Sequence, residues 1–99
     1  MQEFLYKLLL VRGDMLRTGP TPQEQAVVAE HFAYLQDLAV KGAMILVGRT
    51  LTTDENTMGL AIFRAESEEV ALQIMNGDPA VKKGVMTATL YPFKIVLQG

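Results

Sequence analysis

The chain has 99 residues, the usual size of one domain, and we expect residues 1–99 to form a single domain. Lysine and arginine total 9 against 11 acidic residues, and the net charge of -2 gives no reason to expect nucleic acid or an anionic membrane as a partner. There is no cysteine, which excludes disulfides, thiolate nucleophiles and thiolate zinc sites and favours a reducing, cytoplasmic location.

The chain begins with an apolar stretch that predicts a strand. Residues 4–11 are rich in Leu, Phe, Tyr and Val, and the turn-prone Gly13-Asp14 pair follows them. Lys7 interrupts this stretch, which is too short to span a bilayer and lacks the charged start and cleavage site of a signal peptide, so we expect neither. Residues 13–21 hold glycine and proline without periodicity and predict a long loop.

A first helix has a well-marked start and end. Thr21 is suited to cap the helix, Pro22 to be its first residue, and Glu24 to complete a capping box. Gly42 is placed to end the helix after residue 40 or 41.

A hairpin and a second helix follow. Apolar runs at residues 43–51 and 58–64, separated by turn-forming polar residues, predict two antiparallel strands. Ser67 is suited to cap the second helix, which we expect to end at Asn76-Gly77.

The end of the chain predicts a short helical turn and a last strand. Asp78 is a suitable cap for one turn that starts at Pro79, and residues 85–97 predict a strand in which Pro92 marks an edge position or a bulge. The order is β-α-β-β-α-β, the ferredoxin-like α+β arrangement of a four-stranded antiparallel sheet with two helices on one face. We expect strands one and three to run parallel, so that both helices begin at the same edge of the sheet.

The strands are apolar on both faces. In the first strand Leu5 and Leu9 point to one face and Tyr6 and Leu8 to the other, and the last strand alternates in the same way. Two helices cover only one face, and burial of apolar surface stabilises by about 25 cal/mol per Å². We therefore expect a homodimer in which two sheets pack face to face.

The only histidine, His31, lies on the apolar stripe of the first helix. The stripe follows helical spacing and consists of Val27, Val28, His31, Tyr34, Leu35 and Leu38. By default such a histidine is a packed residue with one ring nitrogen hydrogen-bonded to a carbonyl, and a functional role requires a partner.

Asp78 is the best candidate for that partner. Counted from the helix starts at Pro22 and Ser67, at about 1.5 Å per residue, His31 and Asp78 are expected at similar depth along neighbouring helices. A carboxylate on one imidazole nitrogen fixes the tautomer and leaves the other nitrogen free as a general base or acid. The alternative is that Asp78 only caps the turn at Pro79, and the two roles are compatible.

Three arginines are candidates for binding an anionic substrate. They are Arg12 at the end of the first strand, Arg17 in the long loop, and Arg49 beside Gly48 on the second strand. For each of them a solvated surface position is the alternative. Gly48, in the middle of an apolar strand, indicates a bulge or the close approach of a ligand or a helix.

Motifs for cofactors and metals are absent. The sequence contains no GxGxxG, P-loop, CxxC or HExxH pattern, and one histidine does not easily assemble a metal site. We therefore expect no metal and no cofactor, and either a cofactor-independent reaction or plain binding of a small molecule.

Four segments stand out together: HFAYLQDL, KGAMILVGR, NGDPAVKKGV and YPFKIV. In this combination the chain resembles the YciI-like (YCII-related) family of small dimeric α+β barrel proteins over nearly its whole length. The resemblance implies a dimeric barrel with a pocket in each subunit, an active-site pair at His31 and Asp78, and chemistry related to the breakdown of small cyclic or aromatic compounds. Members often have proline after the strand-two glycine, where this chain has Arg49, which favours an acidic ligand.

The leading hypothesis is a cofactor-independent lyase or isomerase. In it His31 moves a proton, Asp78 orients the ring, and an arginine binds a substrate anion. The alternative is a non-catalytic small-molecule-binding or pathway accessory protein, in which His31 only donates a hydrogen bond. A cofactor-free oxygenase on the related barrel is a third hypothesis.

Overall fold

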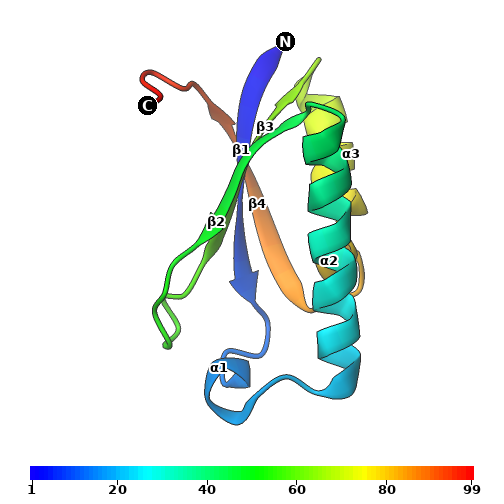
Figure 1. The fold of residues 1–99 in the computed structure, drawn as a ribbon, viewed down its shortest axis with the longest axis vertical. Coiled ribbons are helices and arrows are strands. Elements are labelled where there is room, and N and C mark those ends of the chain that lie inside the picture. The colour runs from blue at the N-terminus through cyan, green and yellow to red at the C-terminus, as the bar shows by residue number, and fades with distance from the viewer.

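The protein, described over residues 1–99 by a computed structural model, has one four-stranded antiparallel sheet with its long helices on one side (Figure 1). The strands are β1 (Gln2–Leu10), β2 (Met44–Arg49), β3 (Gly59–Ala65) and β4 (Met86–Phe93), in the spatial order β2-β3-β1-β4. The helices are α1 (Met15–Thr18), α2 (Pro22–Val40), α3 (Glu68–Gly77) and α4 (Pro79–Lys82). The predicted ferredoxin-like α+β fold is confirmed.

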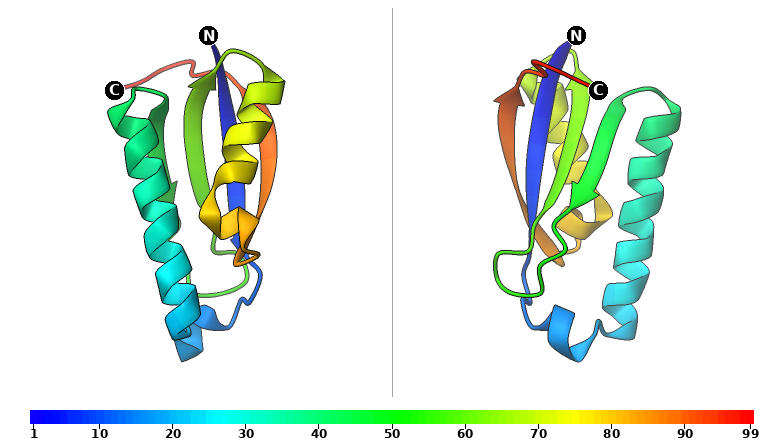
Figure 2. Two further views of the ribbon diagram at one scale, coloured as in Figure 1. Left: turned by 90° about the vertical axis from the view of Figure 1, so that its right-hand side faces the viewer. Right: turned by 60° about the vertical axis from the view of Figure 1, so that its left-hand side comes forward.

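The relative direction of β1 and β3 contradicts the prediction. The two strands were expected to be parallel, but they pair antiparallel, with Gln2 opposite Ala65 and Leu8 opposite Gly59. Each β-α-β crossover joins two parallel strands, and the β2-β3 hairpin reverses the chain between the two crossovers. For this reason α2 and α3 begin at opposite ends of the strands and run antiparallel to each other (Figure 2).

The start of α2 follows the local sequence signals. The Thr21 side chain accepts a hydrogen bond from the Glu24 N–H (3.1 Å), and Glu24 accepts one from the Thr21 N–H (2.8 Å), which is the predicted capping box. Residues 13–21, predicted as a loop, contain the helical turn α1 with buried Met15. A single turn is too short to show a hydrophobic period, so the sequence pattern did not reveal it.

Two details of the edge strands differ from the predictions. The register shift of β2 lies between Met44 and Leu46, whereas Gly48 pairs regularly with Leu60, so a bulge at Gly48 is wrong. β4 is an edge strand, as Pro92 indicated, but it ends at Phe93 instead of residue 97.

The helix-facing side of the sheet carries the core. Its buried residues include Phe4, Tyr6, Leu8 and Phe63, and the Tyr6 ring packs edge-on against Phe63 at a centroid distance of 5.5 Å. No long helix covers the other face (Figure 2). By strand register it carries the exposed apolar residues Leu9, Leu46, Tyr91 and Phe93. The prediction that both faces are apolar is therefore confirmed. No helix combines the length and apolar character needed to cross a bilayer.

Candidate active site

His31 and Asp78 meet even though α2 and α3 run in opposite directions. His31 lies near the middle of α2, and Asp78 directly follows α3 and caps α4. At about 1.5 Å per residue, His31 lies roughly 14 Å from the start of α2 and Asp78 roughly 16 Å from the start of α3. Because the two helices start at opposite ends of the sheet and α2 is about 28 Å long, the two residues reach nearly the same level. Nδ1 of His31 is 2.7 Å from Oδ1 and 2.8 Å from Oδ2 of Asp78. The predicted contact is present, although its premise of parallel strands was wrong.

Asp78 is completely buried, and three donors surround its carboxylate. The Tyr6 hydroxyl donates to Oδ2 (2.8 Å), the Ala80 N–H donates to Oδ1 (3.0 Å), and the His31 ring approaches both oxygens. A buried polar group without partners is costly, and no buried side-chain oxygen or nitrogen in the molecule lacks one. Burial, followed by the charge of Asp78, raises the pKa of the Tyr6 hydroxyl far above its usual value, so Tyr6 remains a donor.

The environment of His31 determines which ring nitrogen carries a proton. A carboxylate only accepts hydrogen bonds, so Nδ1 is the protonated nitrogen that donates to Asp78. Nε2 has no hydrogen-bond partner in the protein, and the side chain is 12% exposed. The ring therefore presents a free acceptor on the side opposite Asp78.

His31 borders a cavity of about 520 Å³ that lies between α2, α1 and the β2-β3 hairpin. Of its 16 lining residues 11 are hydrophobic, and they include Met15, Leu16, Phe32 and Val47. Asp78 is not among the lining residues, so it lies behind the ring, and Nε2 is the part of the pair that a ligand meets. A mostly apolar cavity of this size with a few polar groups is typical of small-molecule sites.

Arg49 is the cationic side chain of the cavity lining. It is exposed and takes part in none of the ion pairs or side-chain hydrogen bonds of the molecule, so its guanidinium is free for an anion. Gly48 also borders the cavity, and a Cβ built on it would meet nothing within 4 Å. The structure thus brings Arg49 and Gly48 to the same cavity as His31.

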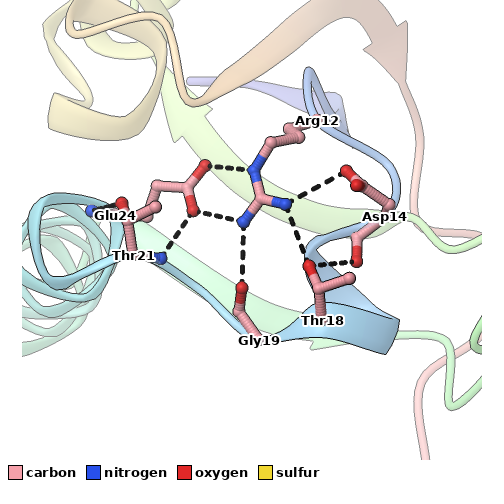
Figure 3. Close-up of polar contacts among 6 residues, drawn as sticks. All are labelled: Arg12, Asp14, Thr18, Gly19, Thr21 and Glu24. Atoms are coloured by element: carbon pink, nitrogen blue, oxygen red, sulfur yellow. Dashed lines mark hydrogen bonds and ion pairs between the residues drawn. The ribbon is translucent and has the colours of Figure 1, made fainter.

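Arg12 has a different environment (Figure 3). Its guanidinium has five N–H donors, and it makes five hydrogen bonds: two to Glu24 (2.6 and 3.0 Å) and one each to Asp14, Thr18 and Gly19. The hydrogen bonds from Arg12 lower the pKa of Glu24 to about 2.

The Arg12 network determines where the segment between β1 and α2 lies. Arg12 does not border the cavity, but it ties this segment to the start of α2, and the segment supplies Met15 and Leu16 to the cavity wall. Arg17 is exposed and does not border the cavity either. Neither arginine is therefore brought to His31.

Tyr6 is the site residue that the sequence reasoning missed. The strand alternation put it on the face opposite Leu5, but did not say which face meets the helices, and its hydroxyl was given no partner. A signal was available, because a tyrosine buried among Phe and Leu usually requires an acceptor for its hydroxyl. Which acceptor it finds depends on a residue 72 positions away.

Comparisons with known proteins identify a family and several similar folds. The family model of the YCII-related domain matches residues 8–94. The structure is similar to that of TftG from Burkholderia phenoliruptrix AC1100, a 5-chloro-2-hydroxyhydroquinone dehydrochlorinase in complex with 2,5-dihydroxybenzoquinone, with 25% identity, 93% of each chain covered and a TM-score of 0.69. An uncharacterised protein from Thermotoga maritima is 10% identical, with a TM-score of 0.55 and 93% and 95% of the two chains covered.

The fold also resembles that of SnoaB, a cofactor-independent oxygenase from Streptomyces nogalater. SnoaB is 9% identical, with a TM-score of 0.52 and 99% and 97% of the two chains covered. At this identity the similarity concerns the fold alone. No functionally curated protein matches the sequence.

Proposed function

This chain belongs to the YCII-related domain family, and from this membership and the His31–Asp78 pair we propose that it is a cofactor-independent enzyme of the lyase or isomerase type. Its substrate is a small, anionic cyclic or aromatic compound. The observation that carries the proposal is the position of His31, whose Nδ1 is held by Asp78 while its Nε2 has no protein partner at the cavity.

In this mechanism His31 is the general base. Nε2 takes a proton from a carbon or hydroxyl of the bound ring, and the resulting imidazolium is stabilised by the Asp78 carboxylate, which lies 2.7 Å from Nδ1. The same nitrogen then returns the proton to another position of the ring or to a leaving group. General acid–base catalysis of this kind contributes about 10²–10⁴-fold to a rate.

The substrate class is supported by the cavity and by the similarity to TftG. A volume of about 520 Å³ with an apolar lining accommodates a single substituted ring. The name of TftG describes loss of HCl from a chlorinated, hydroxylated ring, which is an elimination that requires a proton acceptor. In this chain His31 would supply that acceptor.

Arg49 is assigned to the anionic end of the substrate, and Gly48 borders the same cavity beside it. A free guanidinium suits bidentate binding of a carboxylate or a phenolate. Arg12 acts indirectly in this proposal, because its donors are already used in holding the cavity wall. Replacing Arg49 by Gln is expected to weaken the binding of carboxylated ring compounds and to leave the binding of neutral ones unchanged.

The proposal is tested with 5-chloro-2-hydroxyhydroquinone, followed by chloride release and by product identification. We expect turnover by the wild type and a loss of about 10²-fold or more in His31→Gln. Glu30→Gln is the matched control, since Glu30 is the adjacent residue of α2 and pairs with Lys83 on the exposed surface. Saturable binding of 2,5-dihydroxybenzoquinone without product from a panel of ring compounds would instead favour the alternative, a small-molecule-binding or accessory protein.

The active form in this proposal is a homodimer of the single domain 1–99. Its interface is the sheet face without helices, where Tyr91 and Phe93 are 44% and 38% exposed, because exposed apolar patches of this kind favour a protein partner. The cysteine-free composition supports a cytoplasmic location.

A further inference from the structure

We propose that Tyr6 is a positioning residue for the His31–Asp78 pair: its buried hydroxyl fixes the orientation of the Asp78 carboxylate, which in turn holds His31 in the Nδ1–H tautomer. The effect on turnover rests on the proposed function, whereas the effect on the tautomer does not.

The geometry around the carboxylate carries this proposal. Two donors from different elements hold its two oxygens, the Tyr6 hydroxyl from β1 on Oδ2 (2.8 Å) and the Ala80 N–H from α4 on Oδ1 (3.0 Å). His31 Nδ1 lies almost equally far from both oxygens, at 2.7 and 2.8 Å. Without the Tyr6 donor only His31 contacts Oδ2, and the carboxylate can turn about its Cβ–Cγ bond away from the ring.

The hydroxyl of Tyr6 contributes more than packing. Tyr6 is 0% exposed, and its aromatic neighbours Phe4 and Phe63 fill the same layer without a polar atom. A buried hydroxyl is costly unless it is hydrogen-bonded, and Asp78 is its acceptor. Burial and the nearby carboxylate raise the pKa of Tyr6 far above its usual value, so the group remains a donor to Asp78.

A second tyrosine, Tyr34 on α2, provides a matched control. The Tyr34 hydroxyl also makes one short hydrogen bond, but it donates to the Ile74 carbonyl (2.7 Å) and not to the carboxylate. Tyr6→Phe and Tyr34→Phe each remove one hydrogen-bonded hydroxyl and keep the ring. Only the first removes a donor from Asp78.

The deciding experiment is ¹⁵N NMR of the His31 ring in the intact protein without substrate. We expect the wild type and Tyr34→Phe to give the nitrogen shifts of the Nδ1–H tautomer. In Tyr6→Phe the Nε2–H form should gain on the order of fivefold relative to Nδ1–H, the change that corresponds to losing one hydrogen bond. Identical His31 shifts in the wild type and in Tyr6→Phe would overturn the proposal.

A measurement on the wild type keeps the proposal testable if Tyr6→Phe fails to fold. The Tyr6 hydroxyl proton should be protected from exchange and should show a nuclear Overhauser effect to the His31 ring proton on Nδ1, since both protons lie on the same carboxylate. A rapidly exchanging Tyr6 hydroxyl would contradict the geometry.

The activity readout separates this proposal from the proposed function. With 5-chloro-2-hydroxyhydroquinone as substrate, Tyr6→Phe should lower kcat roughly tenfold at nearly unchanged KM. This is the effect expected when a group that orients the catalytic side chain, here His31, is lost. Tyr34→Phe should keep the wild-type kcat. If the wild type forms product from none of the panel of ring compounds, the proposed function fails and the tautomer measurement still decides the role of Tyr6.

Discussion

Replacing Asp78 by Ala or by Asn should separate its structural role from its chemical role. Alanine removes the acceptor of two fixed donors, the Tyr6 hydroxyl and the Ala80 N–H. An unsatisfied buried hydroxyl costs about 1–3 kcal/mol, and loss of a helix cap costs about 1 kcal/mol. The sum, about 2–4 kcal/mol, lowers the Tm by roughly 10–30 °C in a domain of this size.

Asparagine has the same shape and leaves each contacting group with one partner, although the Tyr6 O–H loses its acceptor. Its carbonyl oxygen accepts from the Ala80 N–H, and its amide donates to the Tyr6 oxygen and to Nδ1 of His31. We therefore expect Asp78→Asn to lose only about 1 kcal/mol of stability. In accepting that bond, however, His31 must change to the Nε2–H tautomer, so the nitrogen at the cavity carries a proton and is no longer a base. Such a reversal lowers turnover by up to about 10⁴-fold in a histidine–aspartate pair.

Circular dichroism melts of the wild type and the two variants, combined with ¹⁵N NMR of His31, test this prediction. The expected pattern is a large loss of Tm in Asp78→Ala, a small one in Asp78→Asn, and a change of His31 tautomer in the latter. If Asp78→Ala has the same Tm as the wild type, the hydrogen bonds to the Asp78 carboxylate do not stabilise the fold. If Asp78→Asn is stable but keeps the Nδ1–H tautomer, the assignment of His31 as a base oriented by Asp78 is refuted.

Three further predictions concern packing, charge and assembly. A Cβ on Gly77 would lie 2.9 Å from the Tyr34 hydroxyl, so Gly77→Ala should lower the free energy of unfolding in urea by about 1–3 kcal/mol. The loss should be smaller in a Tyr34→Phe background, and equal losses in both backgrounds would show that this contact is not the cause. The pKa of Glu24 is lowered from its ordinary 4.5 to about 2 by Arg12, so the pair stabilises the fold above pH 4.5 and this stabilisation is lost as the pH falls towards 2. Stability measured between these pH values should depend less on pH in Arg12→Gln, and an unchanged dependence would contradict the pairing. Tyr91→Glu, on the open sheet face, should weaken self-association on the order of 100-fold in sedimentation experiments, and a monomeric wild type at micromolar concentration would exclude the dimer.

Local signals in the sequence were sufficient for most of the secondary structure. The capping box at Thr21 and the caps at Ser67 and Asp78 are formed as predicted, since each joins atoms only two or three residues apart. The strands follow from their apolar alternation in the same way. The helical turn α1 was missed because four residues are too few to show a period.

The sequence by itself therefore determined the elements other than α1, their order, the apolar character of both sheet faces, and His31 and Asp78 as a candidate pair. Only the tertiary structure decided how these parts meet. The antiparallel course of α2 and α3 follows from the hairpin between the two crossovers, and the Tyr6 hydroxyl finds Asp78 across 72 residues of chain. The tertiary structure also separated the arginines, since Arg12 uses its donors within the protein and Arg49 does not. The physical reason is range: caps and periodicity act within one or two turns, whereas a buried hydrogen bond or a cavity depends on which distant elements pack together.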